Sequence, residues 1–116
     1  MRYLNEATQM TRFDLNPEGC YVYFITPEDE EATTKIGISK DPFRRMEILQ
    51  CAHSKELTLQ IFFGPWSRRD AVNIEREIHQ KLAERKIRGE WFGVNYRVCW
   101  QFFDMKELRY YEGCEI

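Results

Sequence analysis

The sequence Tyr21-Val22-Tyr23-Phe24-Ile25 decides the fold of this chain, together with Lys35-Ile36-Gly37-Ile38-Ser39, which begins ten residues after Ile25. The first stretch is dense in aromatic and β-branched residues, which predicts a strand over residues 20–25, and a second strand is predicted over residues 34–38. An acidic loop led by Pro27 separates them. The two strands are therefore expected to pair as a hairpin.

A helix is predicted directly after this hairpin, over residues 42–51. Ser39 or Asp41 can cap its first turn, and Pro42 takes the first helical position, where its missing N–H costs nothing. Residues 56–63 alternate polar and apolar side chains, which predicts a third strand that Gly64-Pro65 closes.

Two further helices are expected in the second half of the chain. Ser67 caps a long helix over residues 68–85, whose apolar side chains recur every three or four positions. An amphipathic helix is predicted over residues 95–108. The order of elements predicts an α/β fold: a small three-stranded antiparallel sheet flanked by helices, with an extra C-terminal helix. Residues 1–19 are expected to form an N-terminal arm, 20–94 the main domain and 95–116 a helix that packs on it.

Composition limits the class of protein. A chain of 116 residues that is 43% hydrophobic and 15% aromatic can bury one core without disulfides or metal. No apolar run approaches the ~20 residues that a membrane span needs, so a cytoplasmic protein without a membrane partner is expected. The four cysteines are scattered without a C-x-x-C pair, which favours idle thiols over a zinc site.

Charge is distributed unevenly along the chain. The net charge is −2, yet residues 35–97 contain 13 Lys and Arg against 8 Asp and Glu. Phosphate binding depends on local cation density, so this basic middle is compatible with a nucleic-acid partner. Charge alone leaves a mixed solvated surface as an equal alternative.

The hairpin, the basic pair Arg44-Arg45, the segment Ala71-Val72-Asn73-Ile74-Glu75 and the closing Gly89-Glu90-Trp91-Phe92 occur in an order that resembles the GIY-YIG nuclease superfamily. The resemblance is to the branch whose second motif is Lys-Ile-Gly and whose domain closes with Gly-Glu-Trp-Phe. It covers about residues 20–92. It implies a metal-dependent endonuclease that hydrolyses phosphodiester bonds of double-stranded or branched DNA.

This resemblance also implies roles for individual side chains. It assigns Mg²⁺, with Mn²⁺ as a substitute, to Glu75. The other implied site residues are catalytic Tyr23, Lys35, Arg45 and His79, and substrate-binding Tyr21, Gly37 and Arg44.

The residue types suit these roles on general chemical grounds. Strand alternation sends Tyr21 and Tyr23 to one face of the sheet. A guanidinium such as that of Arg45 can engage two phosphate oxygens, and a carboxylate such as that of Glu75 is a hard ligand suited to Mg²⁺. His79 lies one helical turn after Glu75.

Two departures from the family pattern leave roles open. Lys35 occupies a position where a second tyrosine is usual, so either Tyr23 or Lys35 is the group that handles the proton. The family's terminal asparagine is absent, and Glu90-Trp91-Phe92 replaces that segment. Trp91 and Phe92 are interpreted as packing residues, with Glu90 able to approach the site. Core packing is favoured over base stacking for the three tryptophans.

Three functions remain open on the sequence. Endonuclease activity leads. The second is a non-catalytic DNA- or protein-binding module on the same fold, which the acidic overall charge favours. The third is an interaction protein that forms a homodimer through Tyr96, Trp100, Phe103 and Tyr110.

Overall fold

A computed structural model describes residues 12–104 and 106–113 of the chain. Its sheet has six strands, which are β1 (Cys20–Pro27), β2 (Thr34–Ser39), β3 (Leu57–Trp66), β4 (Lys86–Arg88), β5 (Trp91–Phe92) and β6 (Tyr110–Glu112). Neighbouring strands are antiparallel in the order β4-β5-β2-β1-β3-β6. The helices are α1 (Pro42–Cys51) and α2 (Arg68–Lys81), with short 3₁₀ helices η1 (Arg12–Asp14), η2 (Ala83–Arg85) and η3 (Tyr96–Gln101).

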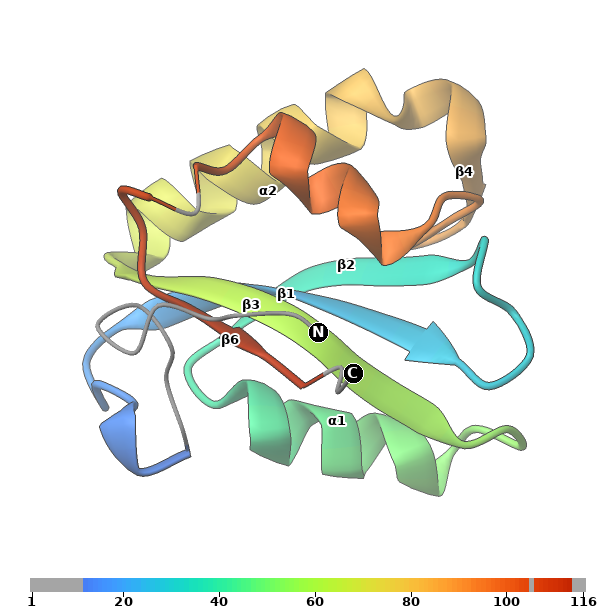
Figure 1. The fold of residues 1–116 in the computed structure, drawn as a ribbon, viewed down its shortest axis with the longest axis horizontal. Helices are drawn as coiled ribbons and strands as arrows, with labels where there is room; N and C mark the ends of the chain where they lie inside the picture. Colours follow the sequence, from blue (N-terminus) through green and yellow to red (C-terminus); the bar gives the residue numbers. More distant parts are fainter. Residues whose placement is uncertain (1–11, 105, 114–116) are drawn as a thin grey trace.

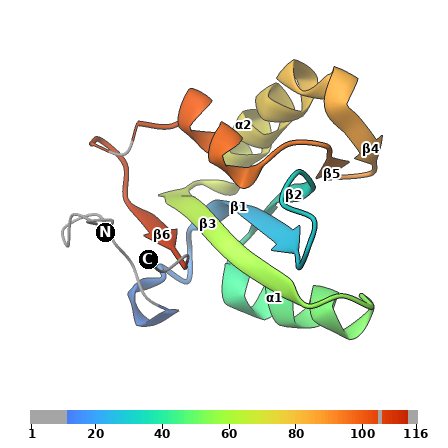
Figure 2. The ribbon, with the colours of Figure 1, turned by 45° about the vertical axis from the view of Figure 1, so that its right-hand side comes forward.

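Helices cover both faces of this sheet. α2 and η3 lie on one face and α1 lies on the other (Figures 1 and 2). Every residue of β1 is buried, because this strand is central in the sheet and both its faces are covered. Val22 and Phe24 pack with Ile78 beneath α2, whereas Tyr21 and Tyr23 belong to the cluster on the α1 side. The strand alternation predicted for the tyrosine pair is confirmed.

The starts of both α-helices follow their local sequence. The Asp41 Oδ1 accepts a hydrogen bond from the Arg44 backbone N–H at 3.0 Å, and Pro42 takes the first turn. The Ser67 Oγ accepts from the Asp70 N–H at 3.1 Å. The predicted helix over Pro42–Cys51 and the Ser67 cap are confirmed.

The α/β class is confirmed, but the prediction of three strands is wrong. β4 and β5 extend the sheet beyond β2, and β6 extends it beyond β3. The long helix also ends earlier than residue 85, with Leu82 as its C-cap. β3 continues through Gly64-Pro65, where Gly64 has φ +142°, which glycine adopts readily.

The predicted C-terminal helix over residues 95–108 is wrong. Asn95 does cap a helix there, but η3 is of the 3₁₀ type and ends at Gln101. The Glu107 and Leu108 N–H groups both donate to the Asp104 carbonyl, which turns the chain. Tyr110 and Tyr111 then pair with Phe63 and Phe62 of β3, because that edge offers free backbone groups.

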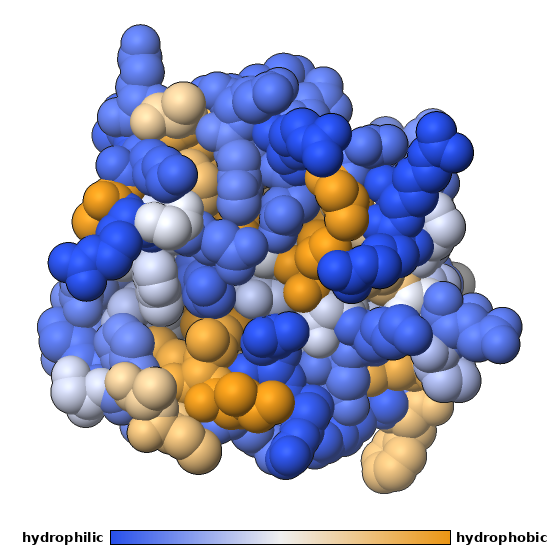
Figure 3. Space-filling view, turned by 180° about the vertical axis from the view of Figure 1, so that it is seen from behind, coloured by the Kyte–Doolittle hydropathy of each residue, from blue (hydrophilic) through white to orange (hydrophobic). Residues whose placement is uncertain are grey.

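The aromatic residues predicted to form a dimer surface lie largely in the core. Tyr96, Phe103 and Tyr110 are buried, and Trp100 packs edge-on against the Phe63 ring at 5.5 Å. These side chains therefore pack within the chain, and homodimer formation stays a prediction. Figure 3 shows the back of the molecule, where hydrophilic residues surround separate apolar patches.

Two sequence expectations concern residues that are only partly described. Most of the predicted N-terminal arm, residues 1–11, lies outside the described ranges, as does Cys114. Cys20 and Cys99 are buried and Cys51 is exposed, and all three are free thiols. No helix within residues 12–104 and 106–113 is long and apolar enough to cross a membrane.

Candidate functional site

The candidate site lies along the edge of β2, beyond the point where its neighbouring strand β5 ends. β5 pairs with β2 only at Thr34 and Lys35. Beyond this pairing, the Ile36 N–H donates a backbone hydrogen bond to the Glu90 carbonyl at 3.0 Å. This bond holds Glu90 beside the outer half of β2. Side chains from both faces of the sheet can meet at this edge.

Gly37 makes room for two of these side chains. It pairs with Tyr23 across the β1–β2 ladder. A Cβ on Gly37 would lie 2.5 Å from the Tyr23 hydroxyl oxygen and 2.9 Å from Glu90 Oε1. Both oxygens therefore occupy the space that a side chain would fill. The groups closest to Gly37 are therefore Tyr23 and Glu90.

Glu75 and Glu90 form a pair of carboxyl groups at this edge. Glu75 reaches it from α2, on the opposite face of the sheet from Tyr23. Burial, followed by the charge of Glu90 and a hydrogen bond with it, raises the pKa of Glu75 to about 7. The Glu75 Oε2 is buried and has no hydrogen-bond partner among the described residues. The Glu75 carboxyl is therefore partly protonated near neutral pH.

Two cations face this pair. The Lys35 Nζ lies 3.1 Å from Glu90 Oε1, and the Lys35 side chain is only 13% exposed. Arg68, at the start of α2, acts on Glu75 as well, and both cations lower the pKa of Glu75 against the larger effect of burial. The site therefore combines two carboxyl groups with cations from β2 and α2.

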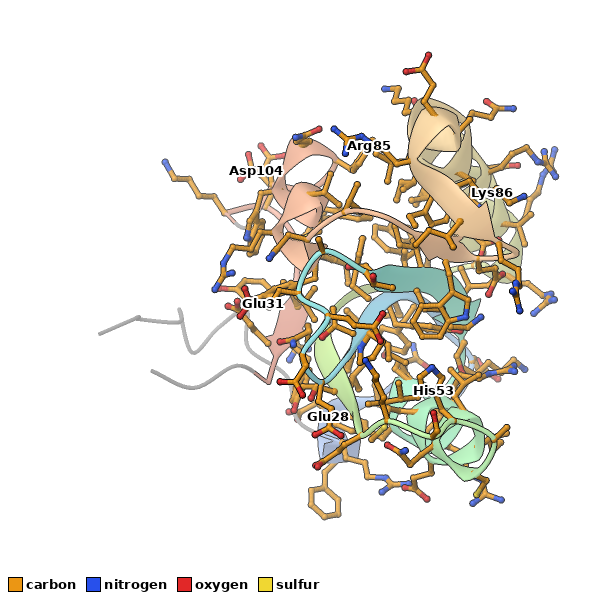
Figure 4. All side chains as sticks on the ribbon, turned by 90° about the vertical axis from the view of Figure 1, so that its right-hand side faces the viewer. Glu28, Glu31, His53, Arg85, Lys86 and Asp104 are labelled. Carbon is orange, nitrogen blue, oxygen red and sulfur yellow. The ribbon has the colours of Figure 1, made fainter. Side chains whose placement is uncertain are left out.

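Trp91 forms a wall beside Lys35. It stands opposite Lys35 across the β2–β5 pair, and the Lys35 Nζ lies 5.6 Å from the centre of its ring system. The His53 ring packs against Trp91 from the loop after α1, with 5.6 Å between ring centroids. Figure 4 labels His53 on this side of the molecule. Trp91 thus limits the movement of Lys35.

The hydroxyl of Tyr23 remains protonated at neutral pH. Burial raises the pKa of Tyr23 well above its usual value, and the charge of Glu90 raises it further. Arg45 opposes these effects from α1. A neutral phenol donates a hydrogen bond but is a poor proton acceptor. Tyr23 can therefore orient a water or a phosphate oxygen.

Arg45 and its neighbour Arg44 have different surroundings. Arg45 acts electrostatically on Tyr23, and its exposed guanidinium makes no ion pair within the described residues. Arg44 is 65% exposed and lies 3.7 Å from the Glu47 carboxylate on the solvent side of α1. Of the two arginines, Arg45 is the one at the candidate site.

His79 links α2 to β2. Its Nε2 lies 2.9 Å from the Ile36 carbonyl oxygen. A carbonyl only accepts, so Nε2 carries the hydrogen. The ring also packs on Phe92, with 4.8 Å between centroids. These contacts hold α2, and with it Glu75, against the edge of β2.

Tyr21 is a core residue, and the expectation that it contacts substrate is wrong. The side chain is completely buried. Its hydroxyl accepts a hydrogen bond from the Asn16 N–H at 2.8 Å, and its ring packs edge-on against Phe62. A fully buried hydroxyl with a backbone partner does not face a ligand.

The donor set fits a single Mg²⁺ ion. No group of three or more His, Cys, Asp or Glu side chains within the described part of the chain could hold a metal. Mg²⁺ usually takes only one or two carboxylates and keeps waters or phosphate oxygens as its other ligands. Glu75 and Glu90 supply two carboxylates, and the Oε2 of Glu75 has no hydrogen-bond partner among the described residues that would compete with an ion.

Replacing Glu75 by Gln should stabilise the metal-free protein at pH 8. The pKa of Glu75, about 7 in the folded chain, exceeds the usual 4.5, so the native state binds more protons between these pH values. The free energy of unfolding therefore falls as pH rises from about 4.5 to 7. We expect Glu75→Gln to gain about 2 kcal/mol at pH 8, or roughly 5–10 °C in Tm.

Thermal unfolding in EDTA at pH 5 and pH 8 measures this difference. The gain should be several times smaller at pH 5, where the native carboxyl is already protonated and the pH is only slightly above the unfolded pKa of 4.5. An equal gain at both pH values would show that Glu75 does not carry a raised pKa.

The T5orf172 domain family matches residues 20–106, which include every element from β1 to η3. The chain belongs to the T5orf172 family. No curated protein and no solved structure matches it.

The resemblance to the GIY-YIG superfamily is therefore wrong, because the family that matches is T5orf172. That resemblance depended on short segments such as Tyr21-Val22-Tyr23 and Lys35-Ile36-Gly37, whose residue types are common in strands generally. The roles of residues in this T5orf172 domain consequently rest on its own geometry.

Sequence reasoning underestimated two residues of the T5orf172 domain. Glu90 was expected to do no more than approach the site, yet it touches or faces Tyr23, Lys35 and Glu75. The sequence signal for Glu90 is its place between a glycine, Gly89, and two aromatic residues, Trp91 and Phe92. Arg68 had no signal, because its position depends on how α2 packs.

Proposed function

We propose that the domain is a divalent-metal-dependent endonuclease that hydrolyses DNA phosphodiester bonds. One observation carries this proposal: the Glu75–Glu90 carboxyl pair has a buried, unpartnered oxygen and is surrounded by cations and a neutral phenol. Such an arrangement is costly for folding, because it buries like charges together. Costly, perturbed groups of this kind concentrate at functional sites.

Glu75 and Glu90 would hold Mg²⁺, or Mn²⁺ in its place. The ion would supply positive charge at the phosphate and so stabilise the charge that develops during hydrolysis. Metal binding requires an ionised carboxylate, so it would also remove the proton that Glu75 partly holds near neutral pH.

The remaining residues act on the phosphate and the attacking water. Arg45 is free to form two hydrogen bonds with phosphate oxygens, and Lys35 adds a second positive charge. The Tyr23 hydroxyl donates a hydrogen bond that orients water beside the phosphorus. Because Tyr23 stays neutral, it orients the water and is a poor acceptor for the proton that the water loses to solvent. The Lys35 Nζ lies 3.1 Å from Glu90 Oε1, so we assign Lys35 to the phosphate and not to proton transfer.

Cleavage of supercoiled plasmid tests the proposal. We expect nicked and linear products in Mg²⁺ or Mn²⁺ and none in EDTA, because the carboxyl pair needs an ion to act on a phosphate. The assay should include linear duplex and branched DNA. Binding to DNA without cleavage in any of these metals and substrates would identify a non-catalytic binding module instead.

A further inference from the structure

A groove of about 420 Å³ continues from the carboxyl pair along α2. Its lining includes Val72, Glu75, Arg76, His79 and Gln80 from α2, and Lys86 from β4. Figure 4 labels Lys86 close to the end of α2. Because Glu75 belongs to both, the groove and the candidate site form one continuous surface.

The groove has positive charge that no carboxylate neutralises. Arg76 and Lys86 are exposed, and neither forms an ion pair with another described residue. Their neighbour Lys81 differs, because it lies 3.4 Å from the Glu77 carboxylate. Glu75, the only acidic residue that lines the groove within the described ranges, lies at the end shared with the candidate site.

The other side chains of the groove suit a sugar–phosphate backbone. Val72 offers an apolar surface to a deoxyribose. Gln80 lies one helical turn after Arg76, so its amide and the Arg76 guanidinium share a face of α2. Cations and amides that follow one another along a groove are typical contacts to nucleic-acid phosphates.

We propose that this groove holds the DNA backbone adjacent to the bond that is cut, with Arg76 and Lys86 on neighbouring phosphates. The proposal rests on the proposed function for the location of the cut, but it concerns binding alone. These contacts would fix the register of the strand over Glu75 without selecting a base sequence.

The double variant Arg76→Gln/Lys86→Gln tests this groove. Its matched control is Arg69→Gln/Lys106→Gln, which removes two exposed cations that do not line the groove. Affinity for a fluorescein-labelled DNA duplex would be measured in EDTA over a range of salt concentrations. We expect the groove variant to reduce the slope of log K against log salt by about two, and the control to leave it nearly unchanged.

Equal salt slopes of DNA affinity for the two double variants would overturn the proposal that the groove binds DNA, even if the wild type cuts DNA. If the groove variant has a smaller salt slope but the wild type never cuts DNA, the groove binds DNA and the nuclease proposal is wrong. Loss of acidic-peptide binding in the groove variant, with DNA binding intact, would assign the groove to a protein partner and overturn the proposal.

Discussion

Glu75→Gln should reduce metal-dependent DNA cleavage by about a thousandfold or more. A bound ion contributes several kcal/mol of charge stabilisation, and each 1.36 kcal/mol corresponds to a factor of ten in rate. Gln keeps the shape of the side chain but removes the charge. The variant should also be more stable than the wild type at pH 8, which separates loss of function from loss of fold.

Initial rates of plasmid nicking over a series of Mg²⁺ concentrations measure this effect. Glu77→Gln is the matched control, because Glu77 lies on the same helix and forms an exposed ion pair with Lys81. Its rate should stay within about twofold of the wild type. If Glu75→Gln cleaves DNA at the wild-type rate, Glu75 is not a ligand of the metal.

Arg45→Ala should slow cleavage by about a hundredfold while weakening DNA binding much less. A guanidinium on the phosphate contributes most where charge develops in the transition state, so its loss lowers kcat more than affinity. Removing a single donor to a developing charge typically costs a factor of 10²–10³ in rate.

Arg44→Ala is the control for this substitution. The two residues are adjacent on α1, yet Arg44 pairs with Glu47 and faces solvent. Single-turnover rates with saturating protein would separate chemistry from binding. Similar rates for the two variants, or an Arg45→Ala defect confined to affinity, would make Arg45 an ordinary backbone contact.

The candidate site was only partly predictable from sequence. Tyr23, Lys35 and Arg45 lie on elements that the local sequence specifies, so their proximity follows from the β1–β2 ladder and from the start of α1. The proximity of Glu75 and Glu90 does not follow in this way. They meet only because α2 packs across β2 while the loop before β5 binds its edge.

The same contrast explains why Tyr21 was misplaced. Alternation correctly gives Tyr21 and Tyr23 the same face of β1. Both side chains are nevertheless buried, and they differ in what their hydroxyl groups contact. The segment before β1 covers Tyr21 through the Asn16 N–H, while Gly37 leaves space for the Tyr23 hydroxyl.

The sequence by itself determined the elements whose stabilising groups are local. β1, β2 and α1 are specified by β-branched and aromatic runs, by the Asp41 cap and by Pro42, all within a few residues of the element they define. The apolar spacing along α2 specifies its face for the same reason. Tertiary structure alone decided the short strands β4, β5 and β6, because two or three residues form a strand only when a distant edge supplies hydrogen bonds. It also decided the protonation of Glu75, since burial and the charge of Glu90 come from packing that no local pattern records.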